Sequence, residues 1–275
     1  MQERMNRRAE IIAVGREILR GRVLDTNSNW LARELTALGG EVSRICTVDD
    51  LPAEIMHEVR TALGRRTDVL VTTGGLGPTF DDRTLEGVAQ ALDRPLVRHE
   101  AAYAFVAETY RRLHAQGAVE HQAMLSSRAK MAMLPEGADM LPNPVGSAPG
   151  MLLRCEGRLL IALPGPPGEL KPMFQASVDP LLRGRWAGRR RVEIKVRTNV
   201  ADESLLDPLF ERVMAAVPGS YLKADPSGFG PEVQLAVYIA GEGTDQDAAY
   251  AIVQRAKDQL RDALAMLRYT LVSEG

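Results

Sequence analysis

The sequence predicts an α/β fold: a three-layer domain with a mostly parallel sheet, followed by a small α+β domain. Three observations lead to this prediction. Short apolar runs alternate with stretches of helical periodicity over the N-terminal part of the chain. Glycine-rich or acidic turns follow the apolar runs. The composition shifts at the arginine-rich segment 183–191, so we expect domains at residues 1–182 and 183–275.

The first three predicted strands span residues 9–14, 42–48 and 69–73, which are short apolar runs bounded by turn residues. A helix over 29–38 follows three residues that favour helix N-termini, Asp25, Thr26 and Asn27. Pro52 opens a second helix, to residue 63, and a third begins at Thr84. Right-handed crossovers then give a parallel sheet covered by helices.

The rest of the chain continues this pattern with more irregular connections. We predict a helix over 99–124, a short strand over 131–134, and a hairpin of strands 151–154 and 158–163 that turns at Glu156-Gly157. A helix begins near Glu169. The small domain is predicted to contain strands at 192–198, near Tyr221 and at 232–239, with helices at 203–217 and 245–264.

Composition excludes several classes of protein. The chain has 275 residues, is 45% hydrophobic and 25% charged, and has a net charge of −2, which provides no global field for nucleic acid or an anionic membrane. No window approaches the ~20 apolar residues of a membrane span, and no apolar signal core follows the N-terminus. Cys46 and Cys155 have no metal-ligand spacing and suit free thiols in a reducing compartment. We therefore expect a cytoplasmic protein without nucleic-acid or membrane partners.

The turn after the third strand carries the strongest functional signal. Gly74, Gly75 and Gly77 allow backbone N–H groups to approach an anion that side chains would block. Asp81 and Asp82 follow, and two carboxylates would repel a phosphate unless a cation lay between them. The turn therefore predicts a metal-bridged nucleotide or pterin phosphate. The alternative is a tight turn in which Asp82 caps the next helix.

Two other strand ends carry acidic residues. Gly15, Arg16 and Glu17 follow the first strand, and Asp49 and Asp50 follow the second. Ligands of open α/β sheets bind at the carboxyl ends of strands, where the strand order reverses. We therefore expect these turns and the glycine turn to form one site.

Two further turns, at 143–150 and 164–168, are rich in glycine and proline. The second lies between a strand and a helix, as the glycine turn does. The loop at 143–150 presents N–H groups to an anion or only turns a corner, and the spacing does not decide between these. The turn at 164–168 repeats the phosphate-binding arrangement of the glycine turn.

A series of motifs resembles a known family. In order they read AEIIAVGREIL, LDTNSNWLARELTALG, VDDLPAEI, TTGGLGPTFDD, LPEGADMLPNPVGSAPGM and LPGPPGELKPMF. They resemble the molybdopterin-binding (molybdenum-cofactor biosynthesis) domain, nearest to the N-terminal region of CinA, the competence/damage-inducible protein A. The resemblance implies a molybdopterin-binding-like α/β domain, a homo-oligomer, and metal-dependent ADP-ribose pyrophosphatase activity. We do not expect the deamidase activity of longer relatives.

The resemblance also assigns residues. It implies catalytic roles for Asp50 and Asp82, and ligation of a divalent Mg, Mn or Co type ion by Glu17, Asp50 and Asp82. It implies ligand binding at Gly15, Asn27, Gly74, Gly75, Gly77, Asn143, Gly146, Ser147, Gly165 and Pro166. Two departures stand out: Arg16 replaces an aspartate of the family pattern, and 126–128 lacks its Asn-rich start.

Three functions remain open at this stage. The first is metal-dependent hydrolysis of a pyrophosphate bond in a dinucleotide-like substrate such as ADP-ribose, with a metal-bound hydroxide as nucleophile. The second is binding of molybdopterin or a nucleotide without turnover, which the loss of an acid at Arg16 favours. The third is a structural or oligomerisation role with a decayed site.

Overall fold

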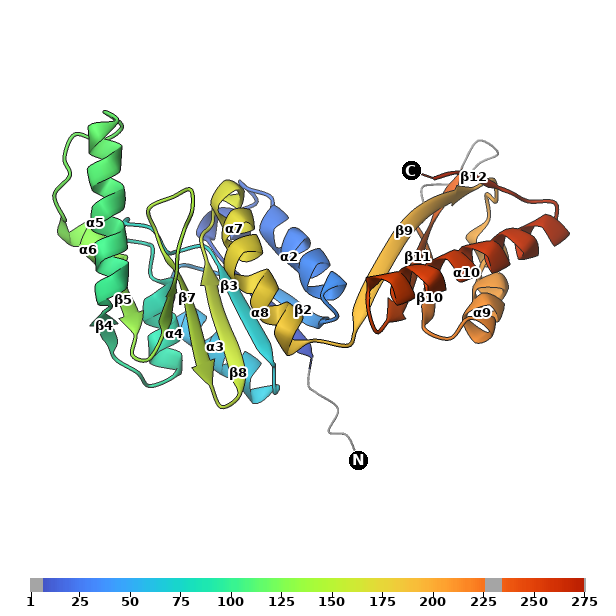
Figure 1. Cartoon of the computed structure of the whole chain (residues 1–275), viewed down its shortest axis with the longest axis horizontal. Helices are drawn as coiled ribbons and strands as arrows, with labels where there is room; N and C mark the ends of the chain where they lie inside the picture. Colours follow the sequence, from blue (N-terminus) through green and yellow to red (C-terminus); the bar gives the residue numbers. More distant parts are fainter. Residues whose placement is uncertain (1–6, 226–233, 275) are drawn as a thin grey trace. The chain divides into compact units, whose positions relative to one another are not determined.

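We examined a computed structural model of the chain, which describes residues 7–225 and 234–274 (Figure 1). The chain forms two compact units, the first of residues 1–35 and 40–185 and the second of residues 36–39 and 186–275. No helix within the described ranges has the length and apolar character needed to span a bilayer.

The first unit is built on a six-stranded sheet with the strand order β2-β1-β3-β8-β7-β6. Its strands are β1 (Arg8–Val14), β2 (Glu41–Val48), β3 (Val69–Thr73), β6 (Asp139–Leu141), β7 (Gly150–Cys155) and β8 (Arg158–Leu163). The first four in spatial order are parallel, and β7 and β6 are antiparallel to their neighbours. The predicted α/β class with a mostly parallel sheet is confirmed.

Helices cover both faces of this sheet (Figure 1). On one face lie α2 (Thr26–Ala37), α7 (Pro167–Met173), the π-helical turn η1 (Phe174–Val178) and α8 (Asp179–Arg185), and on the other lie α3 (Pro52–Gly64) and α4 (Thr84–Ala91). Trp30 of α2 meets Phe174 edge to face, with ring centroids 5.3 Å apart. Ile55 and Val59 of α3 share a core with Ile12 of β1. Alternate side chains of each central strand thus enter different layers, which gives three layers.

The segment between α4 and β6 differs most from the sequence prediction. The strands β4 (Leu96–Arg98) and β5 (Met133–Pro135) pair antiparallel, and α5 (Glu100–Ala115) and α6 (Ser126–Lys130) lie between them. The helix predicted to reach residue 124 ends at Ala115. Gly117 has a φ of 71° and donates to the carbonyl of His114, and Ala118 donates to Leu113. A left-handed glycine with this pair of bonds is a common helix stop.

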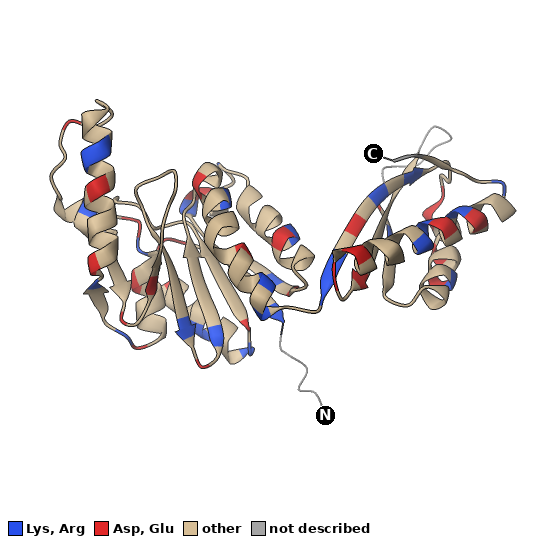
Figure 2. Ribbon diagram, viewed as in Figure 1, with Lys and Arg blue, Asp and Glu red and all other residues tan. Residues whose placement is uncertain are grey.

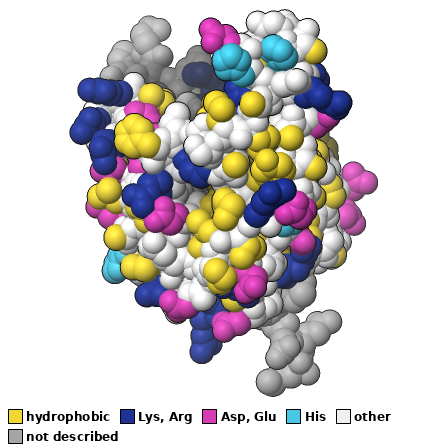
Figure 3. Space-filling model, turned by 90° about the vertical axis from the view of Figure 1, so that its left-hand side faces the viewer, with side chains coloured by type: hydrophobic (Ala, Val, Ile, Leu, Met, Phe, Trp, Pro, Cys, Tyr) yellow, Lys and Arg dark blue, Asp and Glu magenta, His cyan; other side chains and the backbone are white. Residues whose placement is uncertain are grey.

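One face of the first unit shows exposed hydrophobic side chains gathered near its middle (Figure 3). The large hydrophobic side chains of this unit that are exposed include Phe80, Leu125 and Val97, at 90%, 48% and 37%. Homo-oligomerisation stays a prediction.

The second unit has the element order β9 (Arg190–Thr198), η2 (Glu203–Leu205), α9 (Asp207–Ala216), β10 (Ser220–Asp225), β11 (Leu235–Gly243), α10 (Gln246–Met266) and β12 (Leu271–Glu274). Its antiparallel sheet has the order β10-β11-β9-β12. The predicted small α+β unit is confirmed. Residues 232 and 233 of the strand predicted at 232–239 lie outside the described residues.

Candidate ligand-binding site

A cavity of about 500 Å³ lies at the carboxyl ends of β1, β2, β3 and β8. β2 and β3 lie on opposite sides of β1, so the strand order reverses here, as it does where open α/β sheets bind ligands. The predicted site residues that line the cavity are Glu17, Asn27, Asp50, Gly74, Gly75, Gly77, Asp82, Ser147, Gly165 and Pro166. Gly15, Asn143 and Gly146 do not line it.

The glycines of the first turn are required by the backbone. Gly74 and Gly75 have φ angles of 101° and 64°, which side chains rarely adopt. A Cβ on Gly74 would stand 2.2 Å from the carbonyl oxygen of Val14, and one on Gly75 would stand 2.3 Å from Oγ1 of Thr84. Thr84 Oγ1 donates to the carbonyl of Gly74 and its amide donates to that of Gly75, so α4 is joined to the turn from its first residue.

The same turn leaves hydrogen-bond donors at the cavity. Within the described part of the chain, the amides of Gly75, Leu76 and Gly77 donate to no protein acceptor. All three residues line the cavity. Successive amides without protein acceptors form a surface that suits an anionic oxygen.

Asp50 has an environment that disfavours its charge. Its Oδ2 accepts the backbone N–H of Arg16 at 3.0 Å. Burial raises the pKa of Asp50, and the nearby carboxylates of Glu17, Asp49 and Asp81 raise it further. The guanidinium of Arg16 bonds instead to Asp49, with Nε 2.8 Å from Oδ1. Arg16 thus pairs with Asp49 and leaves Asp50 without an ion pair among the described residues.

Asp82 is held within the glycine-turn segment itself. Its Oδ2 accepts from the amide of Thr79 at 2.9 Å and from Oγ1 of Thr79 at 2.6 Å. Lys130 of α6 donates through Nζ to the carbonyl oxygens of Asp82, at 2.9 Å, and Thr79. The alternative in which Asp82 caps the next helix is wrong, because Arg83 is the N-cap of α4 and makes no side-chain cap bond. Oγ1 of Thr79 also lies within hydrogen-bond distance of Asp81, so the two carboxylates compete for its single hydroxyl hydrogen, and this contact lowers the pKa of Asp81.

Asn27 links the first helix to the second turn. Its Nδ2 donates to the carbonyl of Gly165 at 2.6 Å and to Oγ1 of Thr73 at 3.1 Å, which fixes the orientation of the amide. Its Oδ1 is buried and has no hydrogen-bond partner within the described residues. A buried acceptor without a donor is costly, so this oxygen is a place where a ligand N–H or O–H would gain a bond.

Asn143 and Gly146 shape the site from behind. The buried Asn143 donates through Nδ2 to the carbonyl of Ala148 at 2.9 Å and to Glu169 Oε2 at 2.7 Å. Its Oδ1 accepts from the amides of Val145 and Gly146. The resulting loop brings Ser147 to the cavity. Asn143 therefore positions the loop, and Glu169, which lines the cavity, is a partner that the sequence did not indicate.

The carboxylates were tested against the implied divalent ion. The described residues contain no group of three or more His, Cys, Asp and Glu side chains that could hold a metal. Glu17, Asp50 and Asp82 nevertheless line one cavity. Mg²⁺ commonly binds through one or two carboxylates together with substrate phosphates and waters. The divalent ion therefore stays a prediction, with these three carboxylates as its expected ligands.

Comparison with known proteins finds a matching family model, relatives in sequence and a similar solved structure. A family model described as "Probable molybdopterin binding domain" matches residues 10–184. A protein of Aeropyrum pernix is 43% identical over 221 residues, which cover 80% of each chain. Protein PH0439 of Pyrococcus horikoshii is 39% identical over 230 residues, covering 84% of this chain and 88% of the relative. Among solved structures, CinA of Thermoplasma acidophilum, described as having unknown function, has a TM-score of 0.57 at 36% identity and covers 63% of this chain and 98% of its own.

Proposed function

The chain belongs to the family of probable molybdopterin binding domains, and we propose that its cavity binds a small molecule in which a phosphate or pyrophosphate is joined to a pterin or nucleoside. The observation that carries this proposal is the row of amides at Gly75, Leu76 and Gly77, which lack protein acceptors within the described ranges. The unpartnered Oδ1 of Asn27 supports a ligand that also has N–H or O–H donors. Pterins and ribosyl groups both have such donors.

We extend the proposal to hydrolysis of a pyrophosphate bond in a dinucleotide-like substrate such as ADP-ribose. A divalent cation bound with the substrate, near Glu17, Asp50 and Asp82, would neutralise phosphate charge and polarise water. The glycine-turn amides would hold the phosphate oxygens. Asp50 would accept the proton of the attacking water, because it lines the cavity and has no ion pair among the described residues. The new bond joins the water oxygen to phosphorus, and the bridging P–O bond breaks.

Binding without turnover is the second candidate. Asp82 already accepts the amide of Thr79 and shares the Thr79 hydroxyl hydrogen with Asp81, so one of the two proposed catalytic acids is engaged by the turn. In that case the acids would only select ligands that arrive with a cation, and the protein would act as a carrier or sensor.

The test combines binding and chemistry on the full chain. ADP-ribose, nucleoside diphosphates, a phosphorylated pterin and inorganic pyrophosphate are titrated by calorimetry, with and without Mg²⁺, Mn²⁺ or Co²⁺. Products are read by mass spectrometry. Tight binding with two phosphorylated products supports the hydrolase, and tight binding without products under any metal supports the carrier. The absence of binding by every phosphorylated ligand would overturn both.

A further inference from the structure

The small second unit has a sheet face whose residues no function above uses. Its chain order is β9-α9-β10-β11-α10-β12, and α9 and α10 pack against one face of the sheet through Leu222, Val237 and Ile239. Side chains alternate along a strand, so the residues between these point to the opposite face. Within the described part of this unit, both helices lie on the first face, and the second face has no helix of its own.

The strand register sets the residues of this second face in rows. Lys223 of β10, Tyr238 of β11 and Lys195 of β9 are direct neighbours across three strands. Tyr221 pairs with Ala240, one row away from Tyr238 along the sheet. The two tyrosines are therefore diagonal neighbours, with Cα atoms about 7–8 Å apart. Tyr221 is 48% exposed, and Tyr238 is partly exposed.

Cations surround the two rings. Lys195 Nζ lies 5.0 Å from the ring centroid of Tyr238, and the guanidinium carbon of Arg191 lies 5.7 Å from that of Tyr221. Arg197 and Lys223 are exposed, and the described residues provide neither with an ion pair. Along β9, basic residues outnumber acidic ones, and Glu193 is the one acid of the strand (Figure 2).

The charge on this face is unequal. The described residues that face outward from β9, β10 and β11 include four cations, Arg191, Lys195, Arg197 and Lys223, and three acids, Glu193, Asp225 and Glu242. Arg191 is ion-paired with Glu193 and Glu242, and Lys195 with Asp225. The cations of this face that have no ion pair among the described residues are therefore Arg197 and Lys223.

We propose that this face of the second unit binds single-stranded nucleic acid, with bases stacked on Tyr221 and Tyr238 and phosphates contacted by Arg197 and Lys223. Aromatic rings spaced on an open antiparallel sheet give bases a stacking surface, and cations between them follow the phosphate chain. The net charge of the chain predicts no nucleic-acid partner, but the register places the two cations without ion pairs among the described residues, Arg197 and Lys223, on the same face as the two tyrosines. This binding site is independent of the cavity in the first unit.

The experiment uses the full chain with fluorescein-labelled 12-residue oligonucleotides, oligo(U) RNA and oligo(dT) DNA, and measures anisotropy between 25 and 200 mM NaCl. We expect Tyr238→Ala and Tyr221→Ala each to weaken binding at least about fivefold, the low end for one stacked base. Arg197→Gln and Lys223→Gln should each reduce the slope of log affinity against log salt by about 0.7. Comparison of the RNA and DNA arms shows which single strand is preferred.

Matched controls lie on the helical side of the same unit. Tyr250 of α10 is 52% exposed, close to Tyr221, and Arg212 of α9 is exposed. Tyr250→Ala and Arg212→Gln should leave affinity and salt slope unchanged, and circular dichroism confirms that each variant folds. Absence of binding by the parent at 25 mM salt overturns the proposal, as does equal loss in Tyr238→Ala and Tyr250→Ala. If the tyrosine variants instead dissociate a dimer seen by light scattering and no oligonucleotide binds, the face joins two copies of the chain and the proposal is wrong.

Discussion

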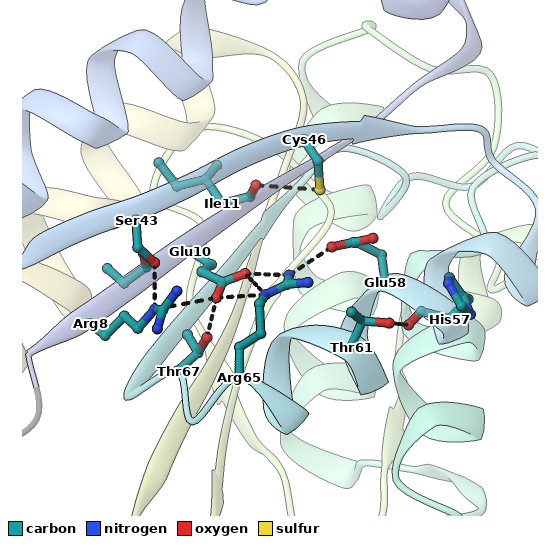
Figure 4. Close-up of polar contacts among 11 residues, drawn as sticks. Arg8, Glu10, Ile11, Ser43, Cys46, His57, Glu58, Thr61, Arg65 and Thr67 are labelled. Atoms are coloured by element: carbon teal, nitrogen blue, oxygen red, sulfur yellow. Dashed lines mark hydrogen bonds and ion pairs between the residues drawn. The ribbon is translucent and has the colours of Figure 1, made fainter.

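Two acids of the first unit, Glu10 and Asp50, have pKa values that are shifted in opposite directions. Glu10 of β1 is only 1% exposed, yet it accepts hydrogen bonds from Arg65 Nε at 3.1 Å, Arg65 Nη2 at 2.5 Å and Thr67 Oγ1 at 2.6 Å (Figure 4). Arg65 also bonds to Glu58. Burial acts to raise the pKa of Glu10, but the bonds from Arg65 and Thr67 outweigh it, and the pKa is lowered.

Asp50 lacks any such compensation. Burial raises its pKa, the one backbone bond from Arg16 does not offset this, and three neighbouring carboxylates add to it. These two acids therefore have different functions. A buried acid whose oxygens have hydrogen-bond and ion-pair partners stabilises the fold. An acid held near other acids is instead stabilised by the positive charge of a bound ligand.

The largest expected effect is on the pair of Arg65 and Glu10. Arg65→Met leaves Glu10 buried without its main cation, and breaking a buried pair in this way costs about 3 kcal/mol or more of unfolding free energy. Urea unfolding followed by circular dichroism measures it. Arg83→Met is the control, since the Arg83–Glu86 pair is 43% and 34% exposed and should contribute at most about 1 kcal/mol. If Arg65→Met lowered the free energy of unfolding by less than about 1 kcal/mol, the pair of Arg65 and Glu10 would not be a main stabiliser of the fold.

The second prediction concerns Asp50. Asp50→Asn should reduce turnover of a pyrophosphate substrate by about 10²-fold or more, the range for loss of an acid–base group. It should leave the free energy of unfolding unchanged or raise it, because the mutation removes a disfavoured charge. Asp81→Asn is the matched cavity control and should affect turnover less, because the Asp81 carboxylate is bound by Thr79. If Asp50→Asn lost both stability and activity, Asp50 would be a structural acid like Glu10, and the distinction between the two would be wrong.

The sequence predicts the residues of the cavity better than it predicts the Glu10 cluster. The strand ends, the glycine turn, Asp50 and Asp82 follow from local patterns, because residues after parallel strands gather at one edge. The partners of these residues do not follow. Asn27 meets Gly165 across 138 positions, and Lys130 meets Asp82 across 48.

The Glu10 cluster shows the same limit. Glu10 appeared only as one residue of an apolar strand, since its pairing with Arg65, 55 positions away, depends on how α3 packs against β1. Such pairs are set by tertiary packing, which periodicity does not encode. The early end of α5 at Gly117 is a local signal that was overlooked.

The third prediction uses pH to separate the two acids. The lowered pKa of Glu10 contributes stability above the unfolded-state pKa of about 4, and this is lost as pH falls through the folded value. The raised pKa of Asp50 works in reverse: its contribution is full below about 4 and is lost as pH rises through the folded value. Unfolding free energies measured from pH 3 to 7 should therefore decline less with rising pH in Asp50→Asn than in the parent. In Glu10→Gln they should rise less. Parallel curves for both variants and the parent would contradict these signs.

The smallest expected effect on stability is at Gly165. A Cβ there would approach nothing closer than Gly74 Cα at 3.6 Å, an ordinary contact, whereas Gly75→Ala adds a clash and a strained φ. Gly165→Ala should change the free energy of unfolding by no more than about 1 kcal/mol, and Gly75→Ala should lower it by about 1–3 kcal/mol. Because Gly165 lines the cavity, its added methyl group occupies ligand space. Calorimetry should thus show weaker phosphate-ligand binding by a Gly165→Ala protein of nearly parental stability. If binding is unchanged, the second turn only shapes the backbone, and recognition belongs to the first turn and Asn27.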